Sequence, residues 1–262
     1  MIYLCLLILT LTRYCRKRIF MNVNGKNKEK NKMSHSKKYL LFLFVCFGLM
    51  APRLAVSQVA NEATEPAIMG PGVIDLLAGG TLDAWDIPSK RWKLEGGSIV
   101  AETGTEKLKT PEWLYTKQRF SDFEFTCELK LTGDNHRNTG IYYRANTINY
   151  KDRFDAASGY EFDAAPSNNF WGSLGDWYER PSLRVYADPD VISKVVNPDD
   201  WNRMTIRARG NRLEYWINGI KTMDYVDHDP KGSREGVIGF QIHDGSVMKI
   251  EFRNIRVLSL EP

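Results

Sequence analysis

The sequence predicts an all-β protein, folded as a sandwich or jelly roll of two antiparallel sheets. After Pro71, short runs of alternating apolar and polar residues follow one another to the end of the chain. Glycine, asparagine, aspartate and proline separate these runs, and neither a long helical period nor an internal repeat interrupts them. Regularly spaced short strands bounded by turn residues are typical of this fold class.

The run from Phe123 to Leu131 shows the clearest strand pattern. Its odd-numbered residues are apolar and its even-numbered residues are polar or charged. Strict alternation of this kind predicts a strand with one face in the core and the other in water.

The segment from Met204 to Ile217 predicts a β-hairpin that turns at Gly210-Asn211. This register places Arg207 opposite Glu214, and such a pair of opposite charges contributes roughly 0.2–1 kcal/mol. We expect the apolar side chains to face the core and the arginine-bearing face to lie in solvent.

Three further strands, at 138–145, 159–164 and 236–243, each carry polar groups on one side and apolar groups on the other. Residues i and i+2 of a strand point to the same side of the sheet. If the polar sides line one concave sheet face, their side chains converge on a shared site. These side chains are Asn138, Tyr142, Arg144, Glu161, Asp163, Gln241 and His243.

The loop after residue 164 supplies the aromatic residues Trp171, Trp177 and Tyr178. Exposed aromatic rings stack on the apolar faces of sugars, so the acids and this loop together predict a carbohydrate site. A structural interpretation stays open, in which the aromatic residues anchor the loop and the acids lie on a solvated strand edge. In that interpretation Arg144 only neutralises the acids, and His243 is a satisfied structural histidine.

The N-terminal part predicts a leader over residues 1–57. Residues 33–57 have a basic start, an apolar run and a small-residue exit, as a secretory signal peptide does, with cleavage near Ser57/Gln58. Residues 1–32 have the reverse order and suggest a start-site artefact before Met33. We therefore expect a secreted or periplasmic protein with no membrane span in its mature form, a flexible lead-in at 58–72 and one domain at 73–262.

The mature chain is predicted to be acidic. The whole chain has 36 Lys+Arg and 32 Asp+Glu, and the leader holds 11 and 1 of these, so 25 basic and 31 acidic residues remain. Nucleic acid is thus a poor partner, because binding phosphates needs a basic surface. Cys127 is the one cysteine outside the leader, which excludes an intramolecular disulfide and predicts a small buried hydrophobic residue.

Several segments, in this order, resemble the 3-keto-disaccharide hydrolase family, whose domain is also described as a 3-keto-glucoside 1,2-lyase/hydratase. They are NTGIYYR, GYEFD, WGSLGDW, WNRMTIRARGNRLEYWING and IGFQIHDGSVMKIEFRNIRV. The resemblance covers Val73 to Leu260 and implies a concanavalin A-like jelly roll in secreted bacterial proteins. After Glu161 the chain departs from the family's Glu-x-Gln-x-x-Asp pattern, because Asp163 occupies the glutamine position.

The resemblance implies an enzyme that cleaves 3-keto-glycosides by removing the C2 proton and eliminating the C1 substituent. Such a site needs a base, a group that stabilises the enolate and an acid for the leaving oxygen. The hypothesis assigns the base to His243 or Asp163, the keto oxygen to Arg144 and Gln241, and the leaving group to Glu161. Asn138, Tyr142, Trp171, Trp177 and Tyr178 are expected to bind the substrate.

Two alternative functions stay open, and so do a bound cation and the partners of the protein. The alternatives are a glycoside hydrolase that uses the two carboxylates directly and a non-catalytic sugar-binding module that uses the tryptophan loop. Aspartate-rich loops such as 188–190 or 224–229 could bind calcium through oxygen ligands. Separately, a divalent cation could replace Arg144 as the stabiliser of the enolate. The expected partners are a glycoside or oligosaccharide substrate and an upstream sugar 3-oxidoreductase that supplies the ketone.

Overall fold

The computed structural model describes residues 64–167 and 169–260 of the chain. The predicted leader at 1–57 lies outside the described residues, and so does the first part of the lead-in. Within the described ranges, no helix has the length and apolar character needed to cross a membrane.

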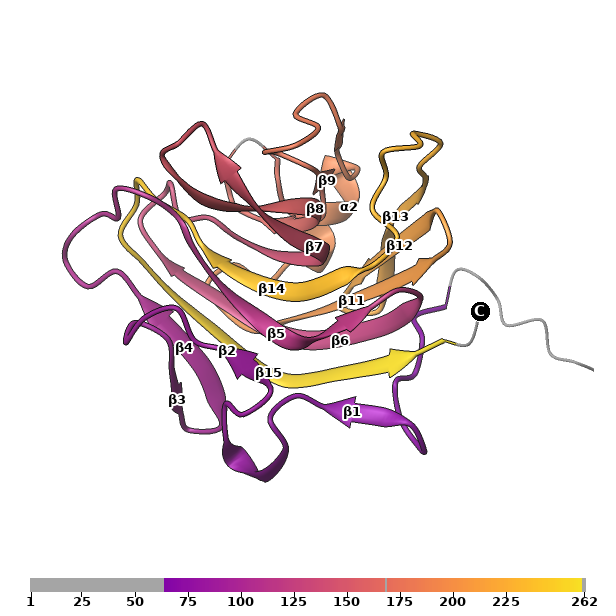
Figure 1. The fold of residues 1–262 in the computed structure, drawn as a ribbon, viewed down its shortest axis with the longest axis horizontal. Coiled ribbons are helices and arrows are strands. Elements are labelled where there is room, and N and C mark those ends of the chain that lie inside the picture. Colours follow the sequence, from indigo (N-terminus) through magenta and orange to yellow (C-terminus); the bar gives the residue numbers. More distant parts are fainter. Residues whose placement is uncertain (1–63, 168, 261–262) are drawn as a thin grey trace, which may run out of the picture. The chain divides into compact units, whose positions relative to one another are not determined.

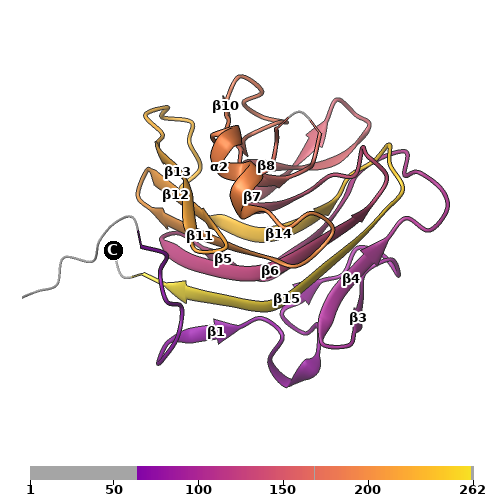
Figure 2. The ribbon, with the colours of Figure 1, turned by 180° about the vertical axis from the view of Figure 1, so that it is seen from behind.

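Two antiparallel sheets form the fold, and Figures 1 and 2 show them from opposite sides. The strands of the first sheet are β1 (Val73–Asp75), β3 (Lys93–Glu95), β4 (Ser98–Glu102), β6 (Phe123–Gly133), β11 (Asn202–Arg209), β12 (Arg212–Ile217), β13 (Ile220–Val226) and β15 (Met248–Ser259). Its order is β13-β12-β11-β6-β15-β4-β3, and β1 also pairs with β15.

The second sheet has the order β10-β9-β8-β7-β14-β5-β2. Its strands are β2 (Trp85–Asp86), β5 (Glu112–Phe120), β7 (Thr139–Tyr150), β8 (Phe154–Ala164), β9 (Leu174–Gly175), β10 (Arg184–Val185) and β14 (Gly236–Ile242). The described ranges also contain the 3-10 helix η1 (Ala78–Gly80) and the helix α2 (Pro189–Val195), whose N-terminus is capped by the side chain of Asp188. The prediction of an all-β jelly-roll sandwich is confirmed.

The core lies between the two sheets and follows the predicted alternation. The apolar residues of β6 are buried, and Cys127 is among them, with burial raising the pKa of its thiol. Phe240 of β14 stacks on Phe252 of β15 with ring centroids 3.8 Å apart, so the two sheets are in direct contact. Burying one such ring stabilises the fold by about 1.5–3 kcal/mol.

The predicted hairpin forms with the predicted register, Arg207 opposite Glu214 and Thr205 opposite Trp216. Its arginine-bearing face is less solvated than expected. The Trp216 ring is fully buried, and the guanidinium of Arg207 lies over it at 5.3 Å from the ring centroid. Long cationic side chains shield the ring here because their stems are apolar.

The part of the predicted flexible lead-in that the structure describes, residues 64–72, is anchored to the domain. Glu65 accepts a hydrogen bond from the Thr205 hydroxyl at 2.6 Å and forms an ion pair with Arg203. Ile68 is 4% exposed. These contacts attach the segment that precedes β1 to the outer face of β11.

Candidate functional site

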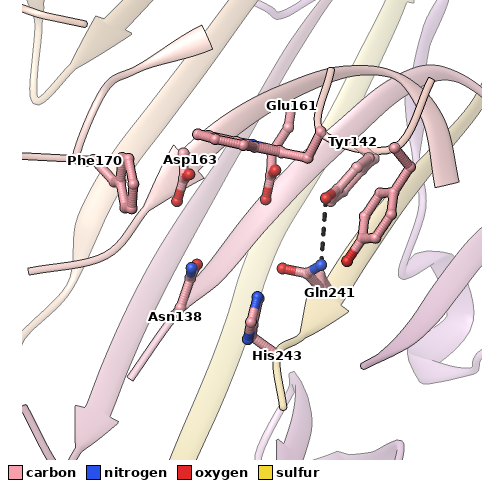
Figure 3. A pocket seen from close by; sticks show the side chains of 9 residues that line it. Asn138, Tyr142, Glu161, Asp163, Phe170, Gln241 and His243 are labelled. Atoms are coloured by element: carbon pink, nitrogen blue, oxygen red, sulfur yellow. Dashed lines mark hydrogen bonds between the residues drawn. The ribbon is translucent and has the colours of Figure 1, made fainter. Parts of the chain in front are cut away.

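A small pocket of about 180 Å³ opens on the outer face of the second sheet, which faces away from the core (Figure 3). Side chains from β7, β8 and β14 converge on it, together with side chains from the loop before β7 and from the loops that follow β8, β9 and β14. The lining residues are Asn138, Tyr142, Glu161, Asp163, Phe170, Trp177, Tyr178, Gln241 and His243.

Strand pairing explains why residues distant in the sequence meet here. On β7 and β8, Tyr142 lies opposite Glu161 and Gly140 lies opposite Asp163. Facing residues on neighbouring strands project to the same side of the sheet. At the end of β14, the backbone N–H of His243 donates to the carbonyl of Asn138 at 3.3 Å, which places those two residues at the same edge.

Gly140 creates the space that the Glu161 carboxyl group occupies. A Cβ atom at position 140 would overlap the carboxyl oxygen Oε1 and would lie 2.6 Å from Cδ of Glu161. A side chain at position 140 would therefore displace the Glu161 carboxyl group, whereas the backbone itself could accept one, since its φ is not in the left-handed region.

We expect Gly140→Ala to displace the Glu161 carboxyl group and to lower catalytic efficiency by at least tenfold while the sheet still folds. The control is Lys117→Ala, at an exposed position of β5 that does not line the pocket. The measurement is kcat/KM beside the thermal midpoint of each variant. Full activity of Gly140→Ala would show that the carboxyl position is unimportant.

Both carboxyl groups of the pocket are almost fully buried, Glu161 and Asp163 each being 2% exposed. Burial raises the pKa of Glu161 to about 8, although the Tyr142 hydroxyl and the Trp177 indole oppose the shift. Burial also raises the pKa of Asp163, and the neighbouring Glu161 charge raises it further. Loss of water disfavours an ionised carboxylate, so burial favours the protonated form of both groups.

The raised pKa of Glu161 predicts how stability depends on pH. Between the ordinary value of 4.5 and about 8, the folded protein holds a proton on Glu161 that the unfolded chain releases. The free energy of unfolding therefore falls as the pH rises through this window. Glu161→Gln should remove part of this fall, which thermal melts from pH 4 to pH 9 can measure. The exposed Glu106→Gln should not, and identical melting curves for the two variants would contradict the assignment.

Amide groups and an imidazole border the pocket opposite the acids (Figure 3). Gln241 Nε2 donates to the Tyr142 hydroxyl at 3.3 Å. Among the described residues, three buried oxygen atoms of this pocket have no hydrogen-bond partner: Asn138 Oδ1, Asp163 Oδ1 and Gln241 Oε1. Since buried polar groups are normally paired, their concentration here indicates a site for a polar ligand.

His243 is partly accessible to water, with 36% of its side chain exposed. Its Nδ1 lies 2.8 Å from the backbone carbonyl of Asp244 and 3.1 Å from that residue's carboxylate. These two acceptors suit the tautomer that carries hydrogen on Nδ1. Nε2 is then the nitrogen that can accept a proton.

The wall formed by Trp177 and Tyr178 is held by a buried ionic network. Arg180 donates to Asp176 at 2.9 Å and to Asp227 at 2.7 Å, and all three side chains are nearly buried. Burial alone would raise the pKa of Asp227, but hydrogen bonds from Tyr160 and Arg180 outweigh it and lower the pKa. This network fixes the loop beside Glu161.

The prediction for Arg144 is wrong. A β-bulge between Tyr143 and Asn146 interrupts the alternation, and Arg144 adopts a positive φ of 48°. The fully buried guanidinium donates to Ser121 O and Gly210 O at 2.6 Å each and to Asp122 at 2.8 Å. It ties the turns at one end of the sandwich together and does not line the pocket.

We expect Arg144→Met to destabilise the fold by about 3 kcal/mol or more, because carbonyl acceptors and Asp122 would lose a buried cationic donor. Catalytic activity measured well below the melting temperature should stay near that of the unmodified protein. Urea unfolding and kcat/KM test the two halves. If the variant folds stably but has lost its activity, Arg144 contributes to the site after all.

The prediction for Trp171 is also wrong. Its side chain is 9% exposed and belongs to the main core, against which Ile192 of α2 also packs. Phe170, its neighbour, lines the pocket instead. The sequence gives no signal for this exchange, because loop residues have no fixed alternation.

The structure offers no support for the aspartate-rich loops as cation sites. Asp224 forms ion pairs with Arg212 and Lys221, and Asp188 caps α2. In the part of the chain that the structure describes, no group of three or more His, Cys, Asp or Glu side chains could hold a metal ion. A cation at the pocket stays a prediction for chelator experiments.

Two structures from Parabacteroides distasonis, both provisionally named as glycosyl hydrolases, have a similar fold. One is 21% identical and covers 72% of this chain and 95% of its own, with a TM-score of 0.54. The other is also 21% identical and covers 72% of this chain and 99% of its own, with a TM-score of 0.50. At this identity the likeness shows the fold alone. Comparison with curated proteins gave no match.

Residues 72–258 match the profile of the 3-keto-alpha-glucoside-1,2-lyase-like domain. The match spans both sheets and every residue that lines the pocket. By this match, the chain belongs to the 3-keto-alpha-glucoside-1,2-lyase-like domain family.

Proposed function

We propose that this protein cleaves 3-keto-glycosides by elimination across C1 and C2, and then hydrates the product. Membership of the family supports a carbohydrate-active domain. The pocket supports the specific reaction, because it combines an imidazole, two buried carboxyl groups and an amide around one small cavity.

In this proposal His243 is the base that abstracts the proton. A ketone at C3 acidifies the hydrogen on C2, so a neutral imidazole is a base of suitable strength. Nε2 takes the C2 proton, and the electron pair of the C–H bond forms the C2–C3 double bond of an enolate. The Asp244 carboxylate beside Nδ1 stabilises the imidazolium that results.

The enolate oxygen is stabilised by Gln241 and Asp163. Arg144 is too far from the pocket for this task, so uncharged donors must supply it. The second N–H of Gln241 Nε2 and the Asp163 carboxyl group, whose protonated form burial favours, both border the cavity and can donate hydrogen bonds to the developing negative charge. Hydrogen bonds to an oxyanion are strongest in a buried site such as this one.

In this proposal Glu161 is the acid that protonates the leaving oxygen on C1. When the enolate collapses, C3 regains its carbonyl, a C1–C2 double bond forms and the bond from C1 to the leaving oxygen breaks. Glu161 holds a proton near pH 7 and gives it to that oxygen, which leaves as an alcohol. The products are an unsaturated 2-hydroxy-3-keto sugar and the alcohol.

Hydration reverses the same proton transfers. The Glu161 carboxylate accepts a proton from a water molecule that attacks C1, and the His243 imidazolium returns a proton to C2. The free 3-keto sugar forms, and both residues recover their starting protonation states.

One observation carries the proposal: two buried carboxyl groups, whose pKa values burial raises, line one pocket with an imidazole whose Nδ1 faces a carbonyl acceptor. A direct glycoside hydrolase needs one carboxylate ionised as nucleophile or base. The elevated pKa values of both acids disfavour that reaction at neutral pH. They suit an elimination in which carboxyl groups donate protons.

The test incubates the protein, with and without chelator, with a native disaccharide and with its 3-keto form. We expect cleavage of the keto form alone, with transient ultraviolet absorption of the conjugated product. Cleavage of both forms would indicate a direct glycosidase, and binding without turnover would indicate a sugar-binding module. Loss of activity with chelator would indicate that the site needs a cation.

The proposal also includes an upstream enzyme and export of the protein from the cytoplasm. A sugar 3-oxidoreductase must act first, because only oxidation at C3 makes the C2 proton removable. Export through the predicted signal peptide would place the enzyme outside the cytoplasm, with mature N-terminus near Gln58. N-terminal sequencing of protein recovered from the producing cell tests export independently of catalysis.

A further inference from the structure

The turn from Asp176 to Arg180 lies between β9 and β10 and carries Trp177 into the wall of the pocket. Its own side chains close it. The Asp176 carboxylate accepts from the backbone N–H of Glu179 at 3.3 Å and from Arg180 Nε at 2.9 Å. The Arg180 carbonyl accepts from the backbone N–H of Leu183 at 2.8 Å, just before β10. Asp176 and Arg180 therefore fix the two ends of the turn relative to each other.

A second anchor joins Arg180 to the other sheet. Arg180 Nη1 donates to Asp227 at 2.7 Å, and the same carboxylate oxygen accepts from the Tyr160 hydroxyl at 2.6 Å. Asp227 follows β13, and its backbone N–H donates to the carbonyl of Asn211 in the β11–β12 hairpin. The Arg180 guanidinium also lies 5.1 Å from the centre of the Tyr160 ring. Arg180 is 7% exposed, so its loss would leave buried carboxyl groups without their cationic donor.

The same turn places the Trp177 ring beside Glu161. Gly175 of β9 lies opposite Glu161 of β8, and facing residues on neighbouring strands project to the same side of the sheet. A Cβ atom at position 175 would lie 2.7 Å from both Nε1 and Cε2 of Trp177, so the indole occupies that space. The Phe170 ring packs on the indole with centroids 5.3 Å apart, and the Arg184 guanidinium lies 4.5 Å from its centroid. The Trp177 ring is thus one of the groups that bury Glu161.

Burial is the largest cause of the raised pKa of Glu161. Water that entered between the Trp177 ring and Glu161 would lower this pKa, because solvation favours the ionised form. The hydrogen bond from the indole acts in the opposite direction to burial and is the smaller effect. The titratable groups that face the carboxyl group from the neighbouring elements are Tyr142 of β7, Asp163 of β8, Asp176 and Tyr178 of the turn, and His243 after β14.

Of these groups, Asp176 is the one that Arg180 contacts directly. Its negative charge raises the pKa of Glu161. Burial raises the pKa of Asp176 itself, and the hydrogen bond from Arg180 opposes that rise. Without Arg180, Asp176 would favour its neutral form and lose its charge effect on Glu161. Entry of water and loss of this charge would both lower the pKa of Glu161.

We propose that Arg180 is a positioning residue for Glu161: it holds the Asp176–Arg180 turn so that the Trp177 ring shields the Glu161 carboxyl group from water. Arg180 does not line the pocket, so it acts through the turn. The inference rests on the proposed function in one respect, because the acid role of Glu161 is what the shielding serves.

The test measures the pKa of Glu161 directly by NMR, in protein whose glutamate side chains carry ¹³C at the carboxyl carbon. The Glu161 signal is the one that Glu161→Gln removes. We expect it to titrate at about pH 8 in the unmodified protein and at about pH 7 or lower in Arg180→Met. The matched control is Arg144→Met, which removes another buried guanidinium and should leave the midpoint at about pH 8.

A milder variant covers the case in which Arg180→Met fails to fold. Asp227→Asn keeps the size of the side chain and the Asp176 contact of Arg180, and removes only one carboxylate partner of the guanidinium. It should lower the midpoint in the same direction by a smaller amount. An unchanged midpoint in a folded Arg180→Met, or in Asp227→Asn where Arg180→Met does not fold, would overturn the positioning role.

Activity gives a second readout. Arg180→Met should lose activity on a 3-keto-disaccharide at a lower pH than the unmodified protein, while removal of the C2 proton, read as exchange with solvent deuterium, continues. A Glu161 midpoint that rises in Arg180→Met, that falls equally in Arg144→Met, or that lies near 4.5 in the unmodified protein would overturn the inference. If the unmodified protein turned over no 3-keto-glycoside, the proposed function would fail, and the NMR titration would still decide whether Arg180 positions Glu161.

Discussion

Replacing Glu161 by glutamine is expected to lower kcat for a 3-keto-disaccharide by about 10²–10⁴-fold. Glutamine keeps the size and the hydrogen-bonding reach of the side chain but has no proton to give. Burial holds the pKa of Glu161 at about 8, so the unmodified group is a competent acid at neutral pH. The alcohol product is a poor leaving group without that proton.

Leaving-group dependence separates this role from a structural one. A 3-keto-glucoside of 4-nitrophenol releases a stable anion, so Glu161→Gln should cleave it with only a small loss of rate. The unmodified protein should also lose activity on the disaccharide as the pH rises past about 8, and Glu161→Gln should lose that limb of the profile. If both substrates slow equally, Glu161 is not the acid.

Replacing His243 by alanine is expected to lower kcat by a similar factor of about 10²–10⁴ and to stop exchange of the C2 hydrogen with solvent deuterium. The exchange experiment isolates the first step, because it reports proton removal even when no bond to the leaving group breaks. Glu161→Gln should keep this exchange while it blocks release of the alcohol.

The matched control is His228→Ala, since His228 is exposed and does not line the pocket. It should retain full activity and full exchange. If exchange persists in His243→Ala, another group is the base. Asp163→Asn would then be the next variant to measure. Thermal melts of both histidine variants ensure that a loss of activity is not a loss of fold.

Much of the fold could be predicted because alternation is a local property of the chain. The run Phe123 to Leu131 forms β6 with its apolar side in the core, and Gly210-Asn211 turns the hairpin in the expected register. The same alternation identified Glu161, Asp163 and Gln241 as one polar face, and strand pairing then brought them together.

The two misplaced residues mark where alternation fails. Arg144 lies at a bulge, where one extra residue reverses which side a side chain faces. Trp171 lies in a loop, where the backbone sets no direction, and its ring packs into the core while Phe170 lines the pocket. Neither departure has a signature in the residues themselves.

The sequence by itself determined the fold class, the hairpin register and which polar residues share a sheet face, because each follows from period-two geometry between near neighbours. Only the tertiary structure decided that Arg144 is structural and that both acids are almost fully buried. Burial depends on strands far apart in the chain, and their side chains meet only when both sheets have formed.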